Sequence, residues 1–241
     1  MKPILIQQGA EAKIFLNKNE VTKDRTPKLY RHPKLDKQIR TRRTRSEAKI
    51  LAKAKSIGVN VPKILKPNTK YSMPQPNQQN MRGYQIPNTD KFKINLEFIP
   101  GDRLSQTLNS YPEKKQLSTM QKLGHQVAKL HANSIIHADL TTSNVILYRP
   151  TSEATHKRSD PQAKRPTSEA TYLIDFGLSY ISTKTEDKTV DLHLMKQALE
   201  AKHFQNAKKL FIAFKKGYQW KDSKKILERL IIVEKRGRYK H

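Results

Sequence analysis

The chain has 241 residues, 35% of them hydrophobic, and its 48 Lys and Arg against 21 Asp and Glu give a formal net charge of +27. This length allows one large domain or two small lobes, and the charge predicts attraction to polyanions, nucleic acid first, with a solvated Lys-rich surface as an equally good explanation. The chain has no cysteine, which excludes disulfides, thiolate metal sites and a Cys nucleophile. It also has no apolar run near the ~18 residues of a membrane span, which excludes a transmembrane segment. We therefore expect a cytoplasmic protein without membrane contact.

The N-terminal part predicts strands followed by a long helix. Two short apolar runs, at residues 4–6 and 14–16, flank a polar break, which is the pattern of two strands joined by a tight loop. A third strand candidate ends near Lys23. Residues 35–57 then follow a helical period that ends before a glycine, so we expect one main helix there.

A segment without periodicity separates this helix from the next strand candidate. Residues 66–91 are rich in Pro, Asn and Gln, which predicts a long surface loop. Residues 92–99 predict a strand that ends at the following Pro-Gly pair.

The second half of the chain is helical in character. Apolar residues recur every three or four positions between Leu117 and Leu130, which predicts an amphipathic helix. Further helices are expected near residues 188–202, 205–218 and 223–235.

Residues 149–171 contain a duplicated sequence. The seven residues RPTSEAT occupy positions 149–155 and return at 165–171. Two copies are too few for a solenoid. We interpret them as a tandem duplication inside a tolerant surface loop, because a long loop insertion adds little closure entropy.

Two motifs in the second half match the needs of phosphoryl transfer from ATP. The sequence His-Ala-Asp ends at Asp139 and is followed by Asn144, which supplies a base and a magnesium ligand on a loop after a helix. The sequence Asp-Phe-Gly begins at Asp175, after an apolar run, and predicts the second metal ligand at a strand end. Each motif alone occurs by chance, but their order and context predict an ATP-binding protein of the protein-kinase type. In this interpretation Asp139 is catalytic, and Asn144 and Asp175 bind Mg²⁺.

The first half contains candidates for binding the phosphates and the adenine. Lys23 ends a strand and Glu47 lies on the following helix, and a Lys–Glu ion pair of this kind orients the lysine towards the phosphates of ATP. We therefore expect Lys23 to be catalytic together with Asp139, and Glu47 to belong to the nucleotide site. In a chain with so many lysines, an ordinary surface lysine is a strong alternative. Residues 96–99 are expected to form the hinge that binds adenine through its backbone, with Glu97 and Ile99 as the contacting residues.

The loop between the first two strand candidates is a further candidate for phosphate binding. It contains Gly9, Ala10, Glu11 and Ala12, with one glycine where a full Gly-rich loop has three. Its backbone N–H groups can still be offered to phosphate, so we include all four residues among the expected nucleotide contacts.

Segments along nearly the whole chain resemble one known family. They are residues 8–12 (QGAEA), 27–33 (PKLYRHP), 43–48 (RTRSEA), 139–144 (DLTTSN), 173–179 (LIDFGLS), and 186–188 (EDK) with 190–192 (VDL). Together they resemble the small atypical kinase of the KEOPS complex, which occurs in archaea and eukaryotes. One departure lies beside the base, where Ala138 occupies a position at which the family usually has glycine.

The resemblance implies an α+β, bilobal protein-kinase-like fold. Its β-rich N-lobe with one main helix would span residues 1–99, its reduced helical C-lobe residues 100–235, and a basic C-terminal tail residues 236–241. The implied function is an ATP-hydrolysing atypical Ser/Thr kinase that uses ATP and Mg²⁺ and supports threonylcarbamoylation of the adenosine beside the tRNA anticodon.

The implied partners are the tRNA-modifying synthase subunit of the KEOPS complex, a further small KEOPS subunit, and tRNA bound through the basic surface and the tail. The tail ends in Tyr-Lys-His rather than in an unbroken basic run. Two other functions stay open: a free-standing protein Ser/Thr kinase that acts on proteins in trans, and a pseudokinase scaffold without chemistry. The intact set of candidate catalytic residues argues against the scaffold.

Overall fold

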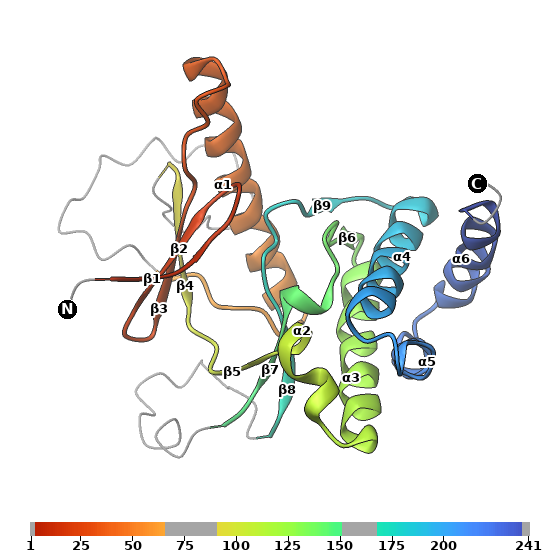
Figure 1. Cartoon of the computed structure of the whole chain (residues 1–241). Coiled ribbons are helices and arrows are strands. Elements are labelled where there is room, and N and C mark those ends of the chain that lie inside the picture. The colour runs from red at the N-terminus through yellow and green to blue at the C-terminus, as the bar shows by residue number, and fades with distance from the viewer. Residues whose placement is uncertain (1–2, 66–90, 151–167, 238–241) are drawn as a thin grey trace. The chain divides into compact units, whose positions relative to one another are not determined.

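The computed structural model describes residues 3–65, 91–150 and 168–237, which form two compact units (Figure 1). The first unit comprises Met1–Ala52 and Lys63–Phe98, and the second comprises Lys53–Pro62 and Ile99–His241. Most of the expected loop at 66–91, the middle of the duplicated segment and the last four residues of the expected tail lie outside the described residues.

The first unit contains an antiparallel sheet of four strands and one long helix. The strands pair in the order β1-β2-β3-β4. Their bounds, with that of the helix, are β1 Ile4–Gln8, β2 Lys13–Asn17, β3 Glu20–Asp24, β4 Lys93–Glu97 and α1 Pro33–Ser56. The three N-terminal strands, the main helix and the strand after the unpatterned segment are therefore confirmed. In the register of the sheet, Lys23 of β3 lies between Ile14 of β2 and Ile94 of β4.

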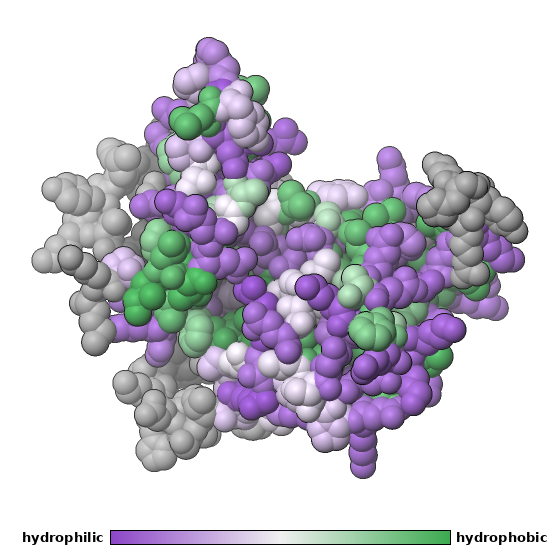
Figure 2. Space-filling model, in the orientation of Figure 1, coloured by the Kyte–Doolittle hydropathy of each residue, from purple (hydrophilic) through white to green (hydrophobic). Residues whose placement is uncertain are grey.

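Burial rises across this sheet from β1 to β4. Every residue of β1 is exposed, including Ile4, Leu5 and Ile6. Figure 2 shows a hydrophobic patch over this edge of the sheet. Ile94 and Leu96 of β4 are buried instead. The apolar core of the first unit therefore gathers at the β3–β4 side of the sheet.

The second unit is mainly helical, with two small sheets. Its helices are α2 Leu104–Thr107, α3 Glu113–Ala132, α4 Thr185–Lys202, α5 Ala207–Gly217 and α6 Ser223–Gly237. Its strands are β5 Gly101–Arg103, β6 Ile135–Ile136, β7 Val145–Tyr148, β8 Ala170–Leu173 and β9 Tyr180–Ile181, paired as β5-β7-β8 and β6-β9. The expected amphipathic helix and the three later helices are confirmed. Among the helices that the structure describes, none is both long enough and apolar enough to cross a membrane.

Two glycines allow α3 and α5 to pack backbone against backbone. A Cβ atom on Gly124 of α3 would lie 2.0 Å from the carbonyl oxygen of Phe214, and one on Gly217 of α5 would lie 1.9 Å from that of Gln121. Real Cβ atoms do not approach backbone so closely, so any larger residue would force the helices apart. This contact fixes α3, the helix that leads into the His-Ala-Asp segment.

Candidate active site

In the first unit, the expected Lys–Glu pair is present and buried. The Lys23 ammonium nitrogen lies 2.8 Å from Oε1 of Glu47, and the two residues are 6% and 1% exposed. Strand β3 supplies the lysine and helix α1 supplies the glutamate. A buried ion pair holds its side chains in one geometry, so the direction of Lys23 is fixed by the fold.

Sequence reasoning missed a second cation on the same carboxylate. Nη2 of Arg25 donates to Oε2 of Glu47 at 2.6 Å, and Arg25 is 4% exposed. Because alternate residues of an extended chain point to the same side, the position of Arg25, two residues after Lys23, was the available signal. Glu47 thus orients two cations, one through each carboxylate oxygen.

The loop between β1 and β2 is closed by its own hydrogen bond. The amide of Gly9 donates to the carbonyl of Ala12 at 3.0 Å. The Glu11 carboxylate is engaged by Nη1 of Arg43 at 2.6 Å and lies 3.7 Å from Nη2 of Arg31. Glu11 therefore ties the loop to α1 through Arg43 and to the segment before α1 through Arg31, and any contact with phosphate is left to the loop backbone.

The expected hinge falls at the end of β4. The Glu97 amide donates to the carbonyl of Lys63 at 2.8 Å, and the Phe98 amide donates to that of Asn19 at 3.0 Å. Among the described residues the Ile99 amide has no acceptor. In the second unit the Ile99 side chain is buried in a small apolar cluster with tyrosines of β7 and β8. Of the three amides, that of Ile99 is the one able to serve a ligand.

In the second unit, Asn144 clamps the candidate base. Its side-chain Nδ2 donates to Oδ2 of Asp139 at 2.8 Å and to the Asp139 carbonyl at 2.9 Å. A 3₁₀ turn over Thr142–Asn144 places the carboxamide in this position. Because Nδ2 makes both bonds, Oδ1 is the atom of Asn144 that is suited to a metal ion.

The antiparallel pair of β7 and β8 brings Asp175 to the same end as Asn144. The Ile174 amide donates to the Asn144 carbonyl at 3.0 Å, one residue before Asp175. Asp175 is exposed and has a φ of 63°, and its Oδ1 accepts a hydrogen bond from the Gly177 amide at 3.2 Å. A left-handed backbone costs a residue with a side chain about 1–2 kcal/mol, and strain of this kind concentrates at functional sites.

The oxygens of Asn144 and Asp175 suit Mg²⁺ by their chemistry. Carboxylate and carboxamide oxygens are the hard donors that this ion prefers, and Mg²⁺ commonly takes only one or two protein ligands beside water and phosphate. Within the described ranges no group of three or more His, Cys, Asp or Glu side chains could hold a metal by itself. The donor set therefore fits a cation that arrives with a phosphate ligand.

A buried carboxylate on α4 supports the backbone beside the candidate base. Oδ2 of Asp191 accepts the His137 amide at 2.6 Å, and Oδ1 accepts the Ala138 amide at 2.7 Å. Ala138 has a φ of 65°, which is the left-handed conformation that glycine adopts without strain. Asp191 therefore holds the backbone of Ala138 in this conformation, at a position where the family that the sequence resembles usually has glycine.

Asp191 is itself held by a buried histidine. Nε2 of His131 lies 3.2 Å from Oδ2 of Asp191, and Nδ1 lies 2.7 Å from the Tyr218 hydroxyl. A carboxylate only accepts, so Nε2 carries the proton and Nδ1 accepts from Tyr218. Burial lowers the pKa of His131 against the opposing effect of Asp191, and burial raises the pKa of Tyr218. Both groups are therefore neutral at pH 7.

His137 links the two motifs of the site. Its ring packs against that of Phe176 with centroids 4.8 Å apart, and its Nε2 lies 3.2 Å from the carbonyl of Ile174. The Ser179 hydroxyl donates to the His137 carbonyl at 2.9 Å. These contacts join the segment before Asp139 to the segment around Asp175, so His137 has a positioning role here.

A full-length relative identifies the family, although no protein-family model matches the chain. The KEOPS complex subunit Bud32 of Pyrococcus abyssi is 34% identical over 250 residues, which cover 98% of this chain and 96% of the relative. The chain belongs to the Bud32 family. The resemblance drawn from the sequence segments is thereby confirmed.

Two further relatives differ from each other in length. A probable serine/threonine-protein kinase BUD32 homolog of Archaeoglobus fulgidus is 31% identical over 96% of this chain and 94% of its own length. A probable bifunctional tRNA threonylcarbamoyladenosine biosynthesis protein of Methanosarcina acetivorans is 34% identical over 97% of this chain but only 35% of that protein. The chain thus spans about a third of the length of such bifunctional relatives.

A solved structure shows the fold. The structure of WaaP in complex with acyl carrier protein matches 98% of this chain and 87% of that chain, with a TM-score of 0.56 and 13% sequence identity. At this identity the likeness concerns the fold alone. The predicted α+β, protein-kinase-like fold is confirmed.

Proposed function

We propose that this chain is an ATP-hydrolysing atypical Ser/Thr kinase that acts as a KEOPS subunit in threonylcarbamoylation of tRNA. The observation that carries the proposal is the clamp of Asn144 on Asp139 at the same end of the β7–β8 hairpin as Asp175. Kinase-type phosphoryl transfer uses these three side-chain types in these roles.

The residues of the second unit carry out the chemistry at the γ-phosphate. Oδ1 of Asn144 and the carboxylate of Asp175 hold Mg²⁺, which supplies positive charge against the phosphate oxygens when bound. The second oxygen of Asp139, Oδ1, orients the attacking water or hydroxyl and receives its proton. The clamp from Asn144 keeps Asp139 from rotating away from this task.

The residues of the first unit bind the nucleotide. Lys23 contacts phosphate oxygens and Glu47 holds it in place, while Arg25 shares that carboxylate. The backbone from Gly9 to Ala12, with Ala10 and Glu11 between them, covers the phosphates. The backbone at Glu97 and Ile99 receives the adenine. Residues 1–99 act as the N-lobe, 100–235 as the C-lobe and 236–241 as the basic tail.

The relatives' names support the biological setting. A region like this chain makes up about a third of proteins named for tRNA threonylcarbamoyladenosine biosynthesis. That name supports a role for this chain in the same biosynthesis. The partners are the tRNA-modifying synthase subunit, a further small KEOPS subunit, and tRNA, which the net charge of +27 attracts. Cytoplasmic location follows from this role.

The experiment is magnesium-dependent phosphate release by the purified chain, with and without the synthase subunit. We expect stimulation by the synthase, and a loss of about 10²-fold or more in Asp139→Asn and Asp175→Asn. Asp222→Asn, an exposed carboxylate outside the site, is the matched control. If both site variants release phosphate like the parent, the assignment of the site is wrong.

The same preparations separate the two alternative functions. Strong phosphorylation of another protein without any effect of the synthase would favour a free-standing kinase. A pseudokinase scaffold predicts no thermal shift with ATP and Mg²⁺.

A further inference from the structure

The cations of α1 divide into two faces. On one face they are paired: Arg40 lies 2.6 Å from Oδ2 of Asp36, and Arg43 lies 2.6 Å from Oε2 of Glu11. On the other face they are exposed, and within the described part of the chain they meet no carboxylate. These exposed cations are Lys34, Lys37, Arg42, Arg45 and Lys49. The cations of the paired face thus stabilise the fold through ion pairs, whereas within the described residues those of the exposed face do not.

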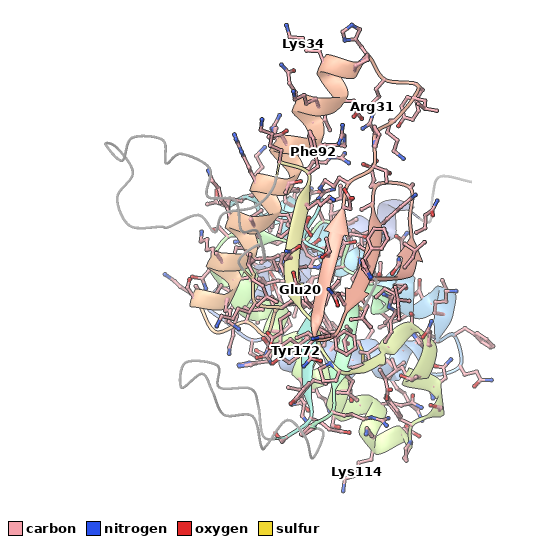
Figure 3. The ribbon with its side chains drawn as sticks, turned by 90° about the vertical axis from the view of Figure 1, so that its left-hand side faces the viewer. Glu20, Arg31, Lys34, Phe92, Lys114 and Tyr172 are labelled. Atoms are coloured by element: carbon pink, nitrogen blue, oxygen red, sulfur yellow. The ribbon has the colours of Figure 1, made fainter. Side chains whose placement is uncertain are left out.

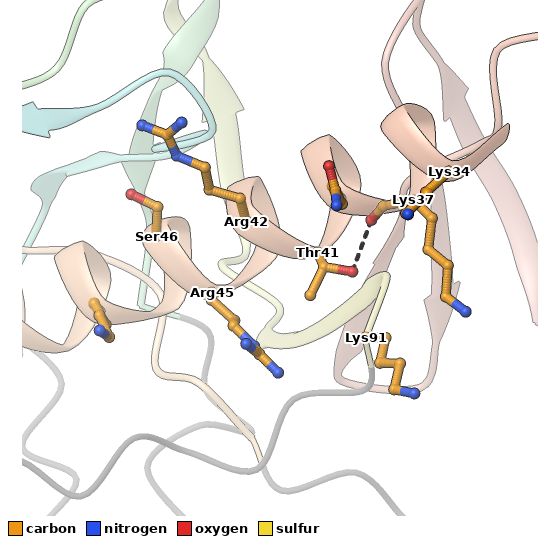
Figure 4. A pocket seen from close by; sticks show the side chains of 9 residues that line it. Lys34, Lys37, Thr41, Arg42, Arg45, Ser46 and Lys91 are labelled. Carbon is orange, nitrogen blue, oxygen red and sulfur yellow. Dashed lines mark hydrogen bonds between the residues drawn. The ribbon is translucent and has the colours of Figure 1, made fainter. Parts of the chain in front are cut away.

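The exposed cations line one hollow of about 740 Å³ together with Lys91 (Figure 4). We call this hollow the α1 groove. The cations recur every three to five residues, so they follow one face of the helix. From Lys34 to Lys49 the helix rises about 22 Å at roughly 1.5 Å per residue. The α1 groove is therefore a basic stripe several turns long.

The segment around Phe92 holds Lys91, the lining residue of the α1 groove that does not belong to α1. The guanidinium of Arg40 lies over the Phe92 ring, 3.9 Å from its centroid, and the Arg25 amide donates to the Phe92 carbonyl at 3.0 Å. Figure 3 shows Phe92 beside α1, with Lys34 near the start of the helix. These contacts hold the residue before Phe92, Lys91, against the helix, so the cations of both elements keep a defined spacing.

The lining indicates what kind of ligand the α1 groove accepts. Small-molecule pockets are lined mainly by apolar and aromatic side chains. Among the described lining residues of the α1 groove there is neither an aromatic side chain on which a base could stack nor a carboxylate, and the three that are uncharged are polar. This chemistry suits a row of phosphates rather than a nucleoside.

We propose that the α1 groove binds the phosphate backbone of RNA without reading its bases. The inference rests on the proposed function in one respect, since tRNA is the polyanion that this function supplies. Phosphate contacts position a nucleic acid and fix its register, whereas base contacts specify its sequence. The α1 groove thus places tRNA relative to the first unit.

The test compares two variants that lose the same charge. The groove variant is Lys37→Gln/Arg42→Gln/Lys49→Gln, and the control is Lys114→Gln/Lys208→Gln/Lys224→Gln, three exposed lysines of the second unit. Binding of a fluorescent, unmodified tRNA transcript is measured by anisotropy at several salt concentrations. Each lost phosphate contact reduces the magnitude of the slope of log K against log salt by about 0.7–0.9, so we expect a reduction of about 2–3 for the three cations removed in the groove variant.

We also expect the groove variant to lose roughly tenfold or more in affinity at low salt, and the control to lose less than about threefold. Equal losses in the two variants would show a diffuse charge effect and would overturn the proposal. So would an unchanged slope in the groove variant. Circular dichroism and melting temperature confirm that both variants fold.

Two further measurements separate RNA binding by the α1 groove from membrane binding and from the proposed ATP chemistry. Vesicles with anionic lipid are the rival polyanion: weaker vesicle binding by the groove variant with unchanged tRNA binding would assign the α1 groove to a membrane surface instead. Phosphate release in the absence of RNA is expected to be the same in the parent and the groove variant. Failure of the proposed ATP chemistry would leave the salt slopes unaffected, so the two proposals fail separately.

Discussion

The side-chain amide of Asn144 donates to the carboxylate of Asp139 at 2.8 Å. This bond sets the orientation of both groups, because it occupies Oδ2 of the aspartate and turns Oδ1 of the asparagine outward. The carboxylate is thus held for proton transfer and the carboxamide oxygen for a cation. The loop from Asp139 to Asn144 thus supplies both the group for proton transfer and the ligand for the cation, and one hydrogen bond orients both.

Truncating Asn144 should remove both the clamp on Asp139 and the metal ligand. In Asn144→Ala we expect phosphate release to fall by about 10²-fold and half-saturation by Mg²⁺ to move to higher concentration, since a ligand and the clamp are lost together. Asn133→Ala is the control, because it removes an exposed carboxamide that donates to the Lys129 carbonyl near the end of α3. A magnesium titration of both variants checks this, and unchanged half-saturation in Asn144→Ala would contradict the metal role.

Replacing Ala138 by glycine is expected to stabilise the protein. The left-handed backbone at φ 65° costs alanine about 1–2 kcal/mol, and glycine avoids that cost but gains roughly 0.4–1 kcal/mol of unfolded-chain entropy. The net gain is on the order of 0.5–1 kcal/mol. Ala198→Gly, inside α4, should instead destabilise by about 1 kcal/mol. Urea unfolding of both variants gives the two signs, and a loss of stability in Ala138→Gly would show that the strain argument is wrong.

Local and long-range features differ in how far the sequence predicts them. The spacing from Asp139 to Asn144 lies within one loop, and the Lys23–Glu47 pair follows from one strand and one helix, so periodicity and motif order found them. The support from Asp191 and His131 is different, because residues 60 positions apart meet only when α3 and α4 pack. No local pattern encodes such a contact.

The same limit applies to the backbone and to close packing. The sequence marks Ala138 as a departure from a family pattern, but its φ of 65° depends on the bonds from Asp191. The glycines at 124 and 217 have no turn signal around them. Their role lies in the approach of two helices, and the packing of those helices is a tertiary property.

In the Lys23–Glu47–Arg25 cluster, substitutions of Glu47 and of Arg25 should lower the free energy of unfolding by different amounts. Glu47→Gln leaves two buried cations facing one neutral amide, and we expect a loss of about 3–5 kcal/mol. In Arg25→Gln the lysine still neutralises Glu47, so the expected loss is smaller, about 1–3 kcal/mol. Denaturant unfolding ranks the two. A larger loss in Arg25→Gln would mean that Glu47 is not the centre of the cluster.

The buried His131 predicts a fall of stability in mild acid. Burial lowers its pKa in the folded protein, while the unfolded chain takes up a proton near pH 6.5. Below that pH the unfolded state binds more protons, so the free energy of unfolding decreases as pH falls and recovers as pH rises. Burial lowers the pKa of His203 in the same direction. His131→Gln should flatten the dependence of melting temperature on pH between about 5 and 6.5.

An exposed histidine of the same helix provides the control for this experiment. His125→Gln should keep the slope of the parent, because the substitution of this exposed residue leaves the buried contacts of His131 in place. If His131→Gln and the parent show the same slope, His131 is not the group that couples acid to unfolding.

The central claim, that ATP turnover by this chain supports tRNA modification, is tested most directly in a reconstituted complex. Threonylcarbamoylated tRNA is measured by mass spectrometry of its nucleosides after incubation of the synthase subunit, the further small subunit, tRNA and either the parent chain or Asp139→Asn. The proposed function predicts sustained modification with the parent and a loss of about 10²-fold in both modification and phosphate release with the variant. Full modification by a complex that no longer turns over ATP would contradict it.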